Sequence, residues 1–219
     1  QLTFNDNAMI GVMNLLKDIV DEKPLFRFVP AHLRQRCAGA LDRGISCILR
    51  CQVIVEGVPT SWCAQHDRHT LAPCRGRSYE LPSLSGMESV GIVRFLMRIE
   101  NPDEPVKRAI RSAVAWFKRV ELRGIRVERK IEEGQPGGID TVVVRDPRAP
   151  SIWARFYDLH SNQPIFSSRD GVPKANLAEI SHERRNGYSW LGPYARVLLD
   201  EDLPRWRARN TAGAHGTVK

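Results

Sequence analysis

The sequence predicts a mainly α-helical fold, a partial α/α toroid of antiparallel helix hairpins with a few short β-strands in the C-terminal half. The first observation behind this prediction is that four segments before residue 121 repeat apolar residues at steps of three and four, which is helical spacing. The second is that the spacing changes to a period of two after residue 124, which is typical of strands. Short or proline-containing connections between the helices favour antiparallel hairpins.

The first helix is expected over residues 6–20. Its apolar positions are Met9, Val12, Met13, Leu16, Ile19 and Val20. Asn5 or Asp6 is placed to cap its start, because short polar side chains accept hydrogen bonds from the free N–H groups of a first turn. Asp6 has a second interpretation, in which its carboxylate faces a site at the mouth of the helix. The two roles can coexist.

Three further helices are expected in the first 120 residues. The second covers residues 31–53, and the third covers residues 86–99. Ser85 and Glu88 precede the third helix with the S-x-x-E spacing of a capping box. The fourth helix follows the Pro-containing break at residues 101–105 and continues to residue 120.

The strand pattern begins at residue 125. Residues 125–131 alternate apolar and charged side chains, residues 135–138 read as a turn, and residues 141–145 form a β-branched run. Residues 153–157 predict a third strand and residues 176–185 a short helix. We expect residues 1–203 to form one domain and the polar residues 204–219 to form a disordered tail.

The segment between the second and third helices, residues 56–84, is a dense polar loop of the kind that carries binding and catalytic residues. Cys63, His66, His69 and Cys74 lie within it and belong to residue types that bind zinc. Their C-x2-H-x2-H-x4-C spacing is not a usual zinc arrangement. We therefore favour the hypothesis that Cys63 and Cys74 are not zinc ligands.

The chain is basic, with 33 Lys and Arg against 25 Asp and Glu, a formal net charge of +8 and a pI of about 9.6. This balance favours polyanionic partners, which are nucleic acid, acidic lipid or acidic polysaccharide, and does not choose among them. No apolar run approaches the roughly 20 residues that cross a bilayer, so no membrane-spanning segment is expected. Several arginines lie in loops beside aromatic residues, and arginine binds carboxylates through a planar two-point contact. These arginines are Arg75, Arg77, Arg155, Arg169, Arg184 and Arg185.

Six motifs in this order carry a resemblance to a known family. They are Thr3-Phe4-Asn5-Asp6-Asn7-Ala8-Met9, Trp62-Cys63-Ala64-Gln65-His66-Asp67, Tyr79-Glu80-Leu81-Pro82-Ser83-Leu84-Ser85-Gly86 with Glu88-Ser89-Val90-Gly91, Trp153-Ala154-Arg155-Phe156-Tyr157, Ser168-Arg169-Asp170-Gly171 and Glu183-Arg184-Arg185-Asn186-Gly187-Tyr188. Together they resemble the signature segments of the family 10 pectate lyases, over the chain from residue 4 to about residue 194.

The resemblance implies a secreted polysaccharide lyase, extracellular or periplasmic and monomeric, that cleaves polygalacturonate in pectin by β-elimination. Its expected partner is a pectin oligosaccharide, and neither nucleic acid nor a membrane. The resemblance also implies calcium as the cofactor and an arginine as the general base. On this basis we assign Arg77 as the base and Asp6 as the calcium-side carboxylate. The residues expected to contact the substrate are Arg155, Arg169, Asp67, Tyr157 and Arg185, with Asp67 alternatively holding Arg77 in place.

The chain departs from the family pattern at its start, because the family has further helices before the Phe4-Asn5-Asp6 segment. We therefore expect an N-terminally incomplete domain, and two other functions stay open. One is a non-catalytic basic helical module that binds a polyanion, either nucleic acid or an acidic polysaccharide. The other is a polysaccharide-binding remnant that has lost catalysis.

Overall fold

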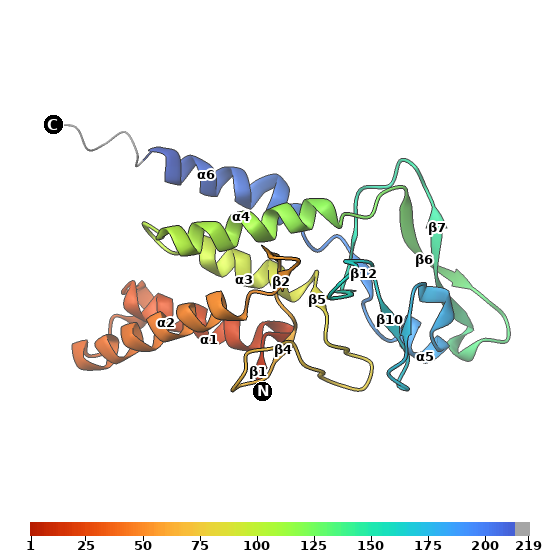
Figure 1. Ribbon diagram of the computed structural model, residues 1–219, viewed down its shortest axis with the longest axis horizontal. Helices are drawn as coiled ribbons and strands as arrows, with labels where there is room; N and C mark the ends of the chain where they lie inside the picture. The colour runs from red at the N-terminus through yellow and green to blue at the C-terminus, as the bar shows by residue number, and fades with distance from the viewer. Residues whose placement is uncertain (213–219) are drawn as a thin grey trace.

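The computed structural model describes residues 1–212 of the 219-residue chain. Most of the helices lie together at one end of the molecule, and the long β6–β7 hairpin lies at the other end beside α5 (Figure 1). Residues 213–219, the end of the tail predicted to be disordered, lie outside the described residues.

Residues 1–212 contain six α-helices, which are α1 (Ala8–Val20), α2 (Ala31–Cys51), α3 (Glu88–Met97), α4 (Glu104–Arg119), α5 (His182–Asn186) and α6 (Leu203–Ala212). The first four lie within two residues of the predicted bounds at each end. Short 3-10 helices cover Asn5–Asn7, Pro24–Phe26, Pro136–Gly138 and Leu177–Glu179, and a π-helix covers Leu198–Asp202. The short helix expected at residues 176–185 is in fact the last of these 3-10 turns followed by α5.

The same residues contain twelve strands that form six two-stranded antiparallel ladders. The ladders are β1 (Leu2–Thr3) with β4 (Gln65–His66), β2 (Ile54–Val55) with β3 (Val58–Pro59), β5 (Leu84–Ser85) with β9 (Phe156–Tyr157), β6 (Ile125–Ile131) with β7 (Ile139–Arg145), β8 (Trp153–Ala154) with β12 (Leu191–Gly192), and β10 (Phe166–Ser167) with β11 (Pro173–Lys174).

The prediction of a mainly α-helical partial toroid with strands only in the C-terminal half is wrong. The described residues are 44% helical and 18% strand, and five of the strands come before residue 86, so the fold is mixed. The physical reason is the length of the missed strands. A strand of two residues cannot show the alternation from which strands are predicted, and its pairing depends on a partner distant in sequence.

The start of α1 differs from the capping prediction. Asn7, not Asp6, is the N-cap residue, and its side chain makes no capping hydrogen bond. Asp6 and Asn7 both have left-handed backbone angles, with φ of 51° and 58°, which Asn and Asp adopt more readily than other non-glycine residues. The tight turn leaves the Asp6 carboxylate exposed, as in the second interpretation of that residue.

The segment 204–212 was predicted to belong to a disordered tail, but it forms most of α6. Leu203 and Trp206 are both buried in the main core, and apolar burial of this kind stabilises a helix whose sequence is otherwise polar. Leu198, at the start of the preceding π-helix, is also completely buried. The domain therefore extends beyond residue 203.

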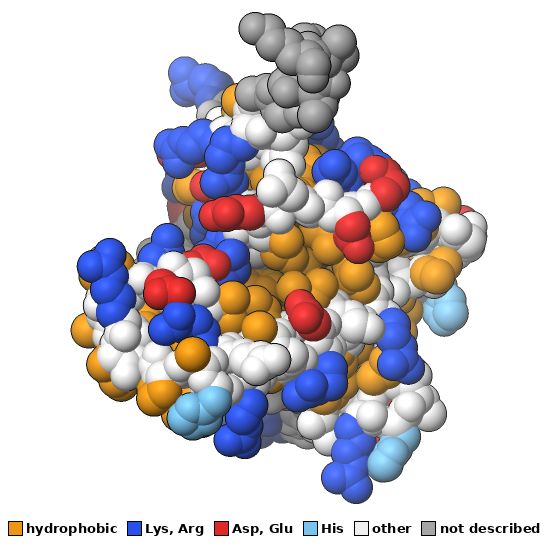
Figure 2. Space-filling view, turned by 90° about the vertical axis from the view of Figure 1, so that its left-hand side faces the viewer, with side chains coloured by type: hydrophobic (Ala, Val, Ile, Leu, Met, Phe, Trp, Pro, Cys, Tyr) orange, Lys and Arg blue, Asp and Glu red, His pale blue; other side chains and the backbone are white. Residues whose placement is uncertain are grey.

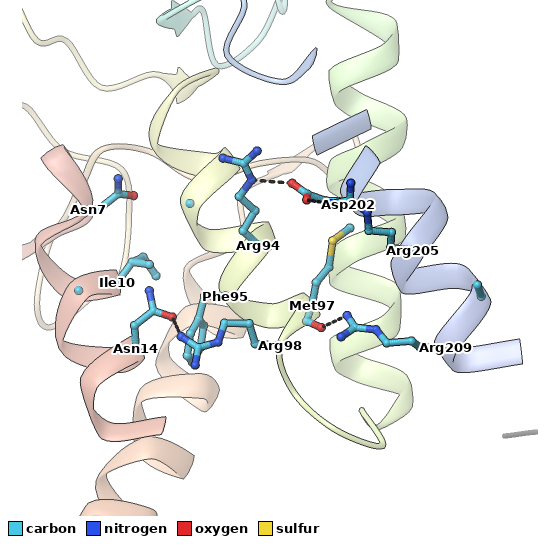
Figure 3. A pocket seen from close by; sticks show the side chains of 13 residues that line it. Asn7, Ile10, Asn14, Arg94, Phe95, Met97, Arg98, Asp202, Arg205 and Arg209 are labelled. Carbon is cyan, nitrogen blue, oxygen red and sulfur yellow. Dashed lines mark hydrogen bonds and ion pairs between the residues drawn. The ribbon is translucent and has the colours of Figure 1, made fainter. Parts of the chain in front are cut away.

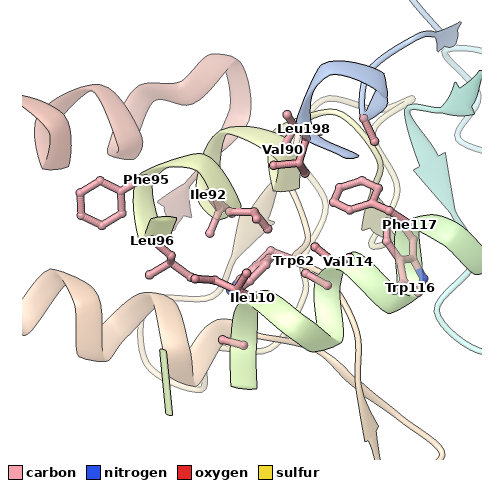
Figure 4. Close-up of a cluster of buried hydrophobic side chains, with 14 of the residues drawn as sticks. Trp62, Val90, Ile92, Phe95, Leu96, Ile110, Val114, Trp116, Phe117 and Leu198 are labelled. Atoms are coloured by element: carbon pink, nitrogen blue, oxygen red, sulfur yellow. The ribbon is translucent and has the colours of Figure 1, made fainter. Parts of the chain in front are cut away.

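The main core lies between α3 and α4 and encloses Trp62 (Figure 4). The indole N–H of Trp62 donates to the Ile48 carbonyl oxygen at 2.7 Å, so the polar atom of this buried ring is satisfied. The backbone carbonyl of Trp62 accepts from the N–H of Ser85 at 2.7 Å. The polar loop is thereby fixed to the start of α3, which makes it a rigid support for side chains.

Candidate active site

Six aromatic and basic side chains come together where the polar loop meets β8–β9, α5 and the segment after β10. We call this set the arginine–tyrosine cluster, and its members are Tyr79, Tyr188, Arg77, Arg155, Arg169 and Arg184. The two tyrosine rings are edge to face, with centroids 5.2 Å apart. Tyr79 and Tyr188 are more than 100 residues apart in the sequence, so members of this cluster are neighbours only in the folded chain.

Three arginines surround the ring of Tyr79. The guanidinium carbons of Arg184, Arg77 and Arg169 lie 4.5, 5.1 and 5.8 Å from its centroid, within the range of cation–π attraction. Arg184 and Arg169 also share the carboxylate of Glu183. A single carboxylate between two arginines leaves an excess of positive charge, which suits a polyanionic ligand.

Arg77 is held by Glu80, which is buried. The guanidinium and the backbone N–H of Arg77 donate to the two carboxylate oxygens of Glu80 at 2.5 and 2.9 Å, and the Tyr188 hydroxyl donates to the same carboxylate at 2.8 Å. The hydrogen bond that Arg77 donates to Glu80 raises the pKa of Arg77 above its ordinary value, so the guanidinium is fully protonated in this arrangement. Its side chain is 53% exposed and can be reached by a ligand.

Arg155 lies between two ladders, because the predicted strand 153–157 is divided into β8 and β9. Its N–H donates to the Trp190 carbonyl at 2.7 Å, and its carbonyl accepts from the Gly86 N–H at 2.9 Å. A Cβ at Gly86 would lie 2.1 Å from the Ala154 carbonyl oxygen, so only glycine allows this approach. The backbone of Arg155 is therefore fixed on both sides.

The Arg155 guanidinium is buried and donates to Glu88 at 2.5 Å, and to Asn5 and Asp6 at 3.3 Å. Burial would lower the pKa of Arg155, but the carboxylate of Glu88 outweighs burial and keeps that pKa raised. Glu88 was predicted only as part of a capping box. The box is present in part, since the Glu88 N–H donates to the Ser85 hydroxyl at 3.0 Å and the hydroxyl donates back to the Glu88 carboxylate.

Two of the residues predicted to contact substrate have other surroundings. Tyr157 is completely buried, and its hydroxyl donates to the Val120 carbonyl and accepts from the Ala154 N–H. Arg185 donates twice to Asp140, at 2.6 Å each, and so joins α5 to β7 outside the arginine–tyrosine cluster.

Asp67 is exposed and accepts hydrogen bonds from Thr70 and His69 within its own turn, which lowers the pKa of Asp67 to about 2. The carboxylate that holds Arg77 is Glu80, so the suggested role of Asp67 in positioning that arginine belongs to Glu80. The ring of His66 is buried and accepts from the Cys63 N–H at 3.1 Å. Within residues 1–212, no group of three or more His, Cys, Asp or Glu side chains is arranged to hold a metal ion.

The residues that sequence reasoning missed are the buried carboxylates Glu80 and Glu88. Both stand inside the motifs that carried the family resemblance, but nothing in their local spacing shows which arginine each one holds. Arg184, named only among the loop arginines, contacts Tyr79, whereas its neighbour Arg185 does not belong to the cluster.

Calcium requires six to eight oxygen ligands, and the described residues offer few of them near the cluster. Asp6 provides an exposed carboxylate, with the side chain 69% accessible, and it is adjacent to Asn5, whose amide donates to it at 2.7 Å. Asn5 and Asp6 could supply only part of the ligand set of a calcium ion, so substrate carboxylates and water would have to supply the other oxygens. In the described part of the chain, no helix has the length and apolar character needed to cross a bilayer.

Comparison with known proteins identifies the family. The family model described as pectic acid lyase matches residues 1–199. The fold is similar to the solved structure of a family 10 polysaccharide lyase from Cellvibrio cellulosa, with a TM-score of 0.82 and 34% sequence identity over 92% of this chain. A mutant of a family 10 polysaccharide lyase from the same organism, solved in complex with trigalacturonic acid, gives the same TM-score and identity.

This chain spans 61% and 62% of the lengths of those two solved chains, respectively. A search of curated proteins finds no match. The match to the family model covers nearly the whole described chain and includes every member of the arginine–tyrosine cluster. The resemblance inferred from the six motifs is therefore confirmed, and the chain belongs to the pectic acid lyase family.

Proposed function

We propose that this protein is a pectate lyase that cleaves polygalacturonate by calcium-dependent β-elimination. The observation that carries the proposal is the arginine–tyrosine cluster in a chain of this family. Four cations beside two aromatic rings provide guanidinium groups for uronate carboxylates and ring faces for sugars. Because pectin lies outside cells, we also propose that the protein is secreted. We further propose that it acts as a monomer.

The reaction removes the proton from C5 of a galacturonate unit and expels the glycosidic oxygen from C4, which leaves a C4–C5 double bond. A bound calcium ion would supply charge neutralisation at the carboxylate next to C5, with Asp6 among its ligands. The protein must also provide a base and hold the sugar carboxylates.

We assign the base to Arg77 because its guanidinium is fixed yet accessible. Glu80 and two tyrosine rings fix it, at 5.1 Å from Tyr79 and 5.5 Å from Tyr188. Since Glu80 raises the pKa of Arg77, the arginine can accept a proton only after this contact is weakened and at alkaline pH. The positive charges of Arg169 and Arg184, which lie around the same Tyr79 ring as Arg77, favour its neutral form.

The exposure of the remaining arginines indicates which of them bind substrate and which position other residues. Arg169 is 64% exposed and Arg184 lies beside it over Tyr79, so these two are placed to bind uronate carboxylates. Arg155 is 6% exposed and paired with Glu88, which favours a positioning role towards Asp6 over full two-point contact with a sugar. Its single contact with Asp6 orients the carboxylate that we assign to calcium.

The test is the absorbance of unsaturated product formed from polygalacturonate by the 219-residue protein, with calcium and with chelator, from neutral to strongly alkaline pH. We expect product only with calcium, with a rate that rises with pH. A rate that is flat with pH and unaffected by chelator would contradict this mechanism.

A second candidate is a non-catalytic module that binds acidic polysaccharide, which the net charge of +8 and the protonated state of Arg77 support. Calorimetric titration with trigalacturonic acid separates the two. Binding without any product at alkaline pH in calcium would identify the module, whereas binding with product identifies the lyase.

A further inference from the structure

The ring of Tyr188 is held on three sides by other aromatic rings. It stacks on Phe156 at a centroid distance of 6.2 Å, and it meets Tyr79 and Trp190 edge to face at 5.2 and 5.1 Å. Aromatic contacts of this kind favour one ring orientation over others. The direction of the Tyr188 hydroxyl is therefore set by the packing of its own ring.

The Tyr188 hydroxyl and the Arg77 guanidinium share one oxygen atom of Glu80. The hydroxyl donates to Oε1 at 2.8 Å, and the guanidinium donates to the same Oε1 at 2.5 Å. The other oxygen, Oε2, accepts from the Arg77 backbone N–H at 2.9 Å. Burial raises the pKa of Glu80, but these hydrogen bonds outweigh burial and hold that pKa below its ordinary value. Glu80 is thus a buried carboxylate that depends on its donors.

The backbone keeps Glu80 in place if the Arg77 side chain moves. The Glu80 N–H donates to the Arg77 carbonyl oxygen at 2.9 Å, and the Glu80 carbonyl accepts from the Gly76 N–H at 3.0 Å. A guanidinium that turned towards a substrate would take one donor from a carboxylate that is 3% exposed. A buried charge that loses its partner is strongly destabilised unless another donor remains. The remaining side-chain donor is Tyr188, and burial raises the pKa of Tyr188, so its hydroxyl keeps its proton in alkaline solution.

We propose that Tyr188 is a positioning residue that allows Arg77 to leave Glu80 and act as the base. This inference rests on the proposed function, because it takes Arg77 as the base of a lyase. With the hydroxyl present, Glu80 keeps a neutral donor on Oε1 while the guanidinium faces the substrate. Without it, Glu80 would hold the Arg77 proton more tightly, and the arginine would become neutral only at a higher pH. Tyr188 itself transfers no proton.

Other charged groups surround this link without replacing it. The charged and titratable side chains that face it are Tyr79, Arg155, Arg169, Arg184, Glu88 and Glu183. Arg155 lies 4.5 Å from the Tyr188 ring centroid but is paired with Glu88. Within residues 1–212, the side chains that donate to the Glu80 carboxylate are those of Arg77 and Tyr188. Removing the Tyr188 hydroxyl therefore changes this carboxylate directly.

A second group of arginines lies at the helical end of the molecule, in a groove of about 920 Å³ between α1, α3 and α6 (Figure 3). The acceptors there are Asp202 for Arg94, Asp18 for Arg98, Glu201 for Arg205 and the Met97 carbonyl for Arg209. Figure 2, which views this end, shows Asp and Glu side chains among the Lys and Arg. Phe95, the aromatic residue of the described lining, is 1% exposed. That lining presents no aromatic face to a sugar, so we assign oligogalacturonate binding to the arginine–tyrosine cluster.

The test compares Tyr188→Phe with the parent 219-residue protein on polygalacturonate with calcium, from neutral to strongly alkaline pH. We expect the rising limb of kcat to move up by at least about 0.5 pH unit, which lowers kcat at a fixed pH on that limb about threefold, with little change in KM. A merely structural role would lower kcat equally at every pH. Tyr194→Phe is the matched control, since its hydroxyl donates to the Ser189 carbonyl at 2.8 Å, and its profile should match the parent.

Glu80→Gln tests the link from the other side. A neutral amide does not raise the pKa of Arg77 as the carboxylate does, so the rising limb should move to lower pH, opposite to Tyr188→Phe. In the Glu80→Gln background, Tyr188→Phe should move the limb by less than about 0.2 pH unit. Tyr188→Met repeats the comparison if circular dichroism shows that Tyr188→Phe is unfolded. Limbs that move in the same direction in the two single variants would overturn the proposal.

The carboxyl pKa of Glu80 gives a readout that needs no turnover. In an NMR titration of protein labelled with carbon-13 at the Glu carboxyl groups, that pKa should rise by at least about 0.5 unit in Tyr188→Phe and stay unchanged in Tyr194→Phe, because a lost donor disfavours the charged form. If the parent forms product but either the limb or this pKa is unchanged in Tyr188→Phe, the inference fails and the proposed function stands. If the parent forms no product with calcium, both fail.

Discussion

The buried ion pair between Arg155 and Glu88 allows one prediction to be worked out in full. The two side chains are 6% and 1% exposed, and their nitrogen and oxygen atoms lie 2.5 Å apart. Removing one partner of such a pair leaves an uncompensated buried charge, which typically costs about 3–5 kcal/mol. Arg155 keeps weaker contacts with Asn5 and Asp6 at 3.3 Å, so we expect Glu88→Gln to cost about 3 kcal/mol, near the lower end of that range.

The assay is urea unfolding, monitored by tryptophan fluorescence and circular dichroism. The free energy of unfolding of a native domain is about 5–15 kcal/mol, so a loss of this size can be measured. The double variant Glu88→Gln with Arg155→Met removes both charges and should recover part of the loss. Glu201→Gln serves as the control, since its pair with Arg205 is exposed and should be worth less than about 1 kcal/mol. A loss below about 1 kcal/mol in Glu88→Gln, or purely additive effects in the double variant, would refute the reasoning.

Three further predictions concern the base, the response to acid and the backbone. Arg77→Lys should lower kcat on polygalacturonate at least tenfold, about 1.4 kcal/mol, with little change in KM, because it keeps the charge but alters the position of the base. Arg185 holds the pKa of Asp140 well below its usual range, so the stabilisation is present above about pH 3.9 and is lost as the pH falls towards the folded-state pKa. In thermal melts, the melting temperature of Asp140→Asn should therefore fall less than that of the parent protein as the pH drops below that value. Gly86→Ala should cost more than about 2 kcal/mol in urea unfolding, whereas Gly11→Ala should stabilise α1 by about 0.5–1 kcal/mol.

Each of these has a clear contrary outcome. Full turnover in Arg77→Lys would remove the base assignment and direct the search to Arg75 or Arg155. Identical acid profiles for the parent and Asp140→Asn would mean that another carboxylate controls acid unfolding. Equal effects of the two alanine substitutions would mean that the close approach at Gly86 is relieved by a backbone shift.

Local periodicity explains which parts of the fold could be predicted. The helices α1 to α4 and the β6–β7 hairpin each repeat their apolar residues often enough to be recognised. The two-residue ladders do not, and α6 has a polar sequence that is helical only because Leu203 and Trp206 are buried. These elements depend on contacts between residues that are far apart in the sequence, so a short stretch of sequence does not show them.

The candidate site shows the same division. The motifs led to Arg155 and Arg169, and Arg77 was chosen because it lies just before the Tyr79-Glu80 motif. All three lie in the arginine–tyrosine cluster. They did not show that Tyr157 is buried or that Arg185 pairs with Asp140, because burial and partner choice follow from the tertiary fold. Adjacent arginines in one motif thus have different surroundings.

The position of Arg155 between two ladders has a consequence for how the protein is made. Its guanidinium contacts Asp6 across a separation of 149 residues, and its backbone N–H needs the Trp190 carbonyl. Contacts so distant in sequence form late in folding. While the chain emerges from the ribosome, α1 to α4 can pack before Arg155, Arg169 and Arg184 have been synthesised. The nascent protein therefore acquires its binding site only when the segment up to residue 190 has been synthesised.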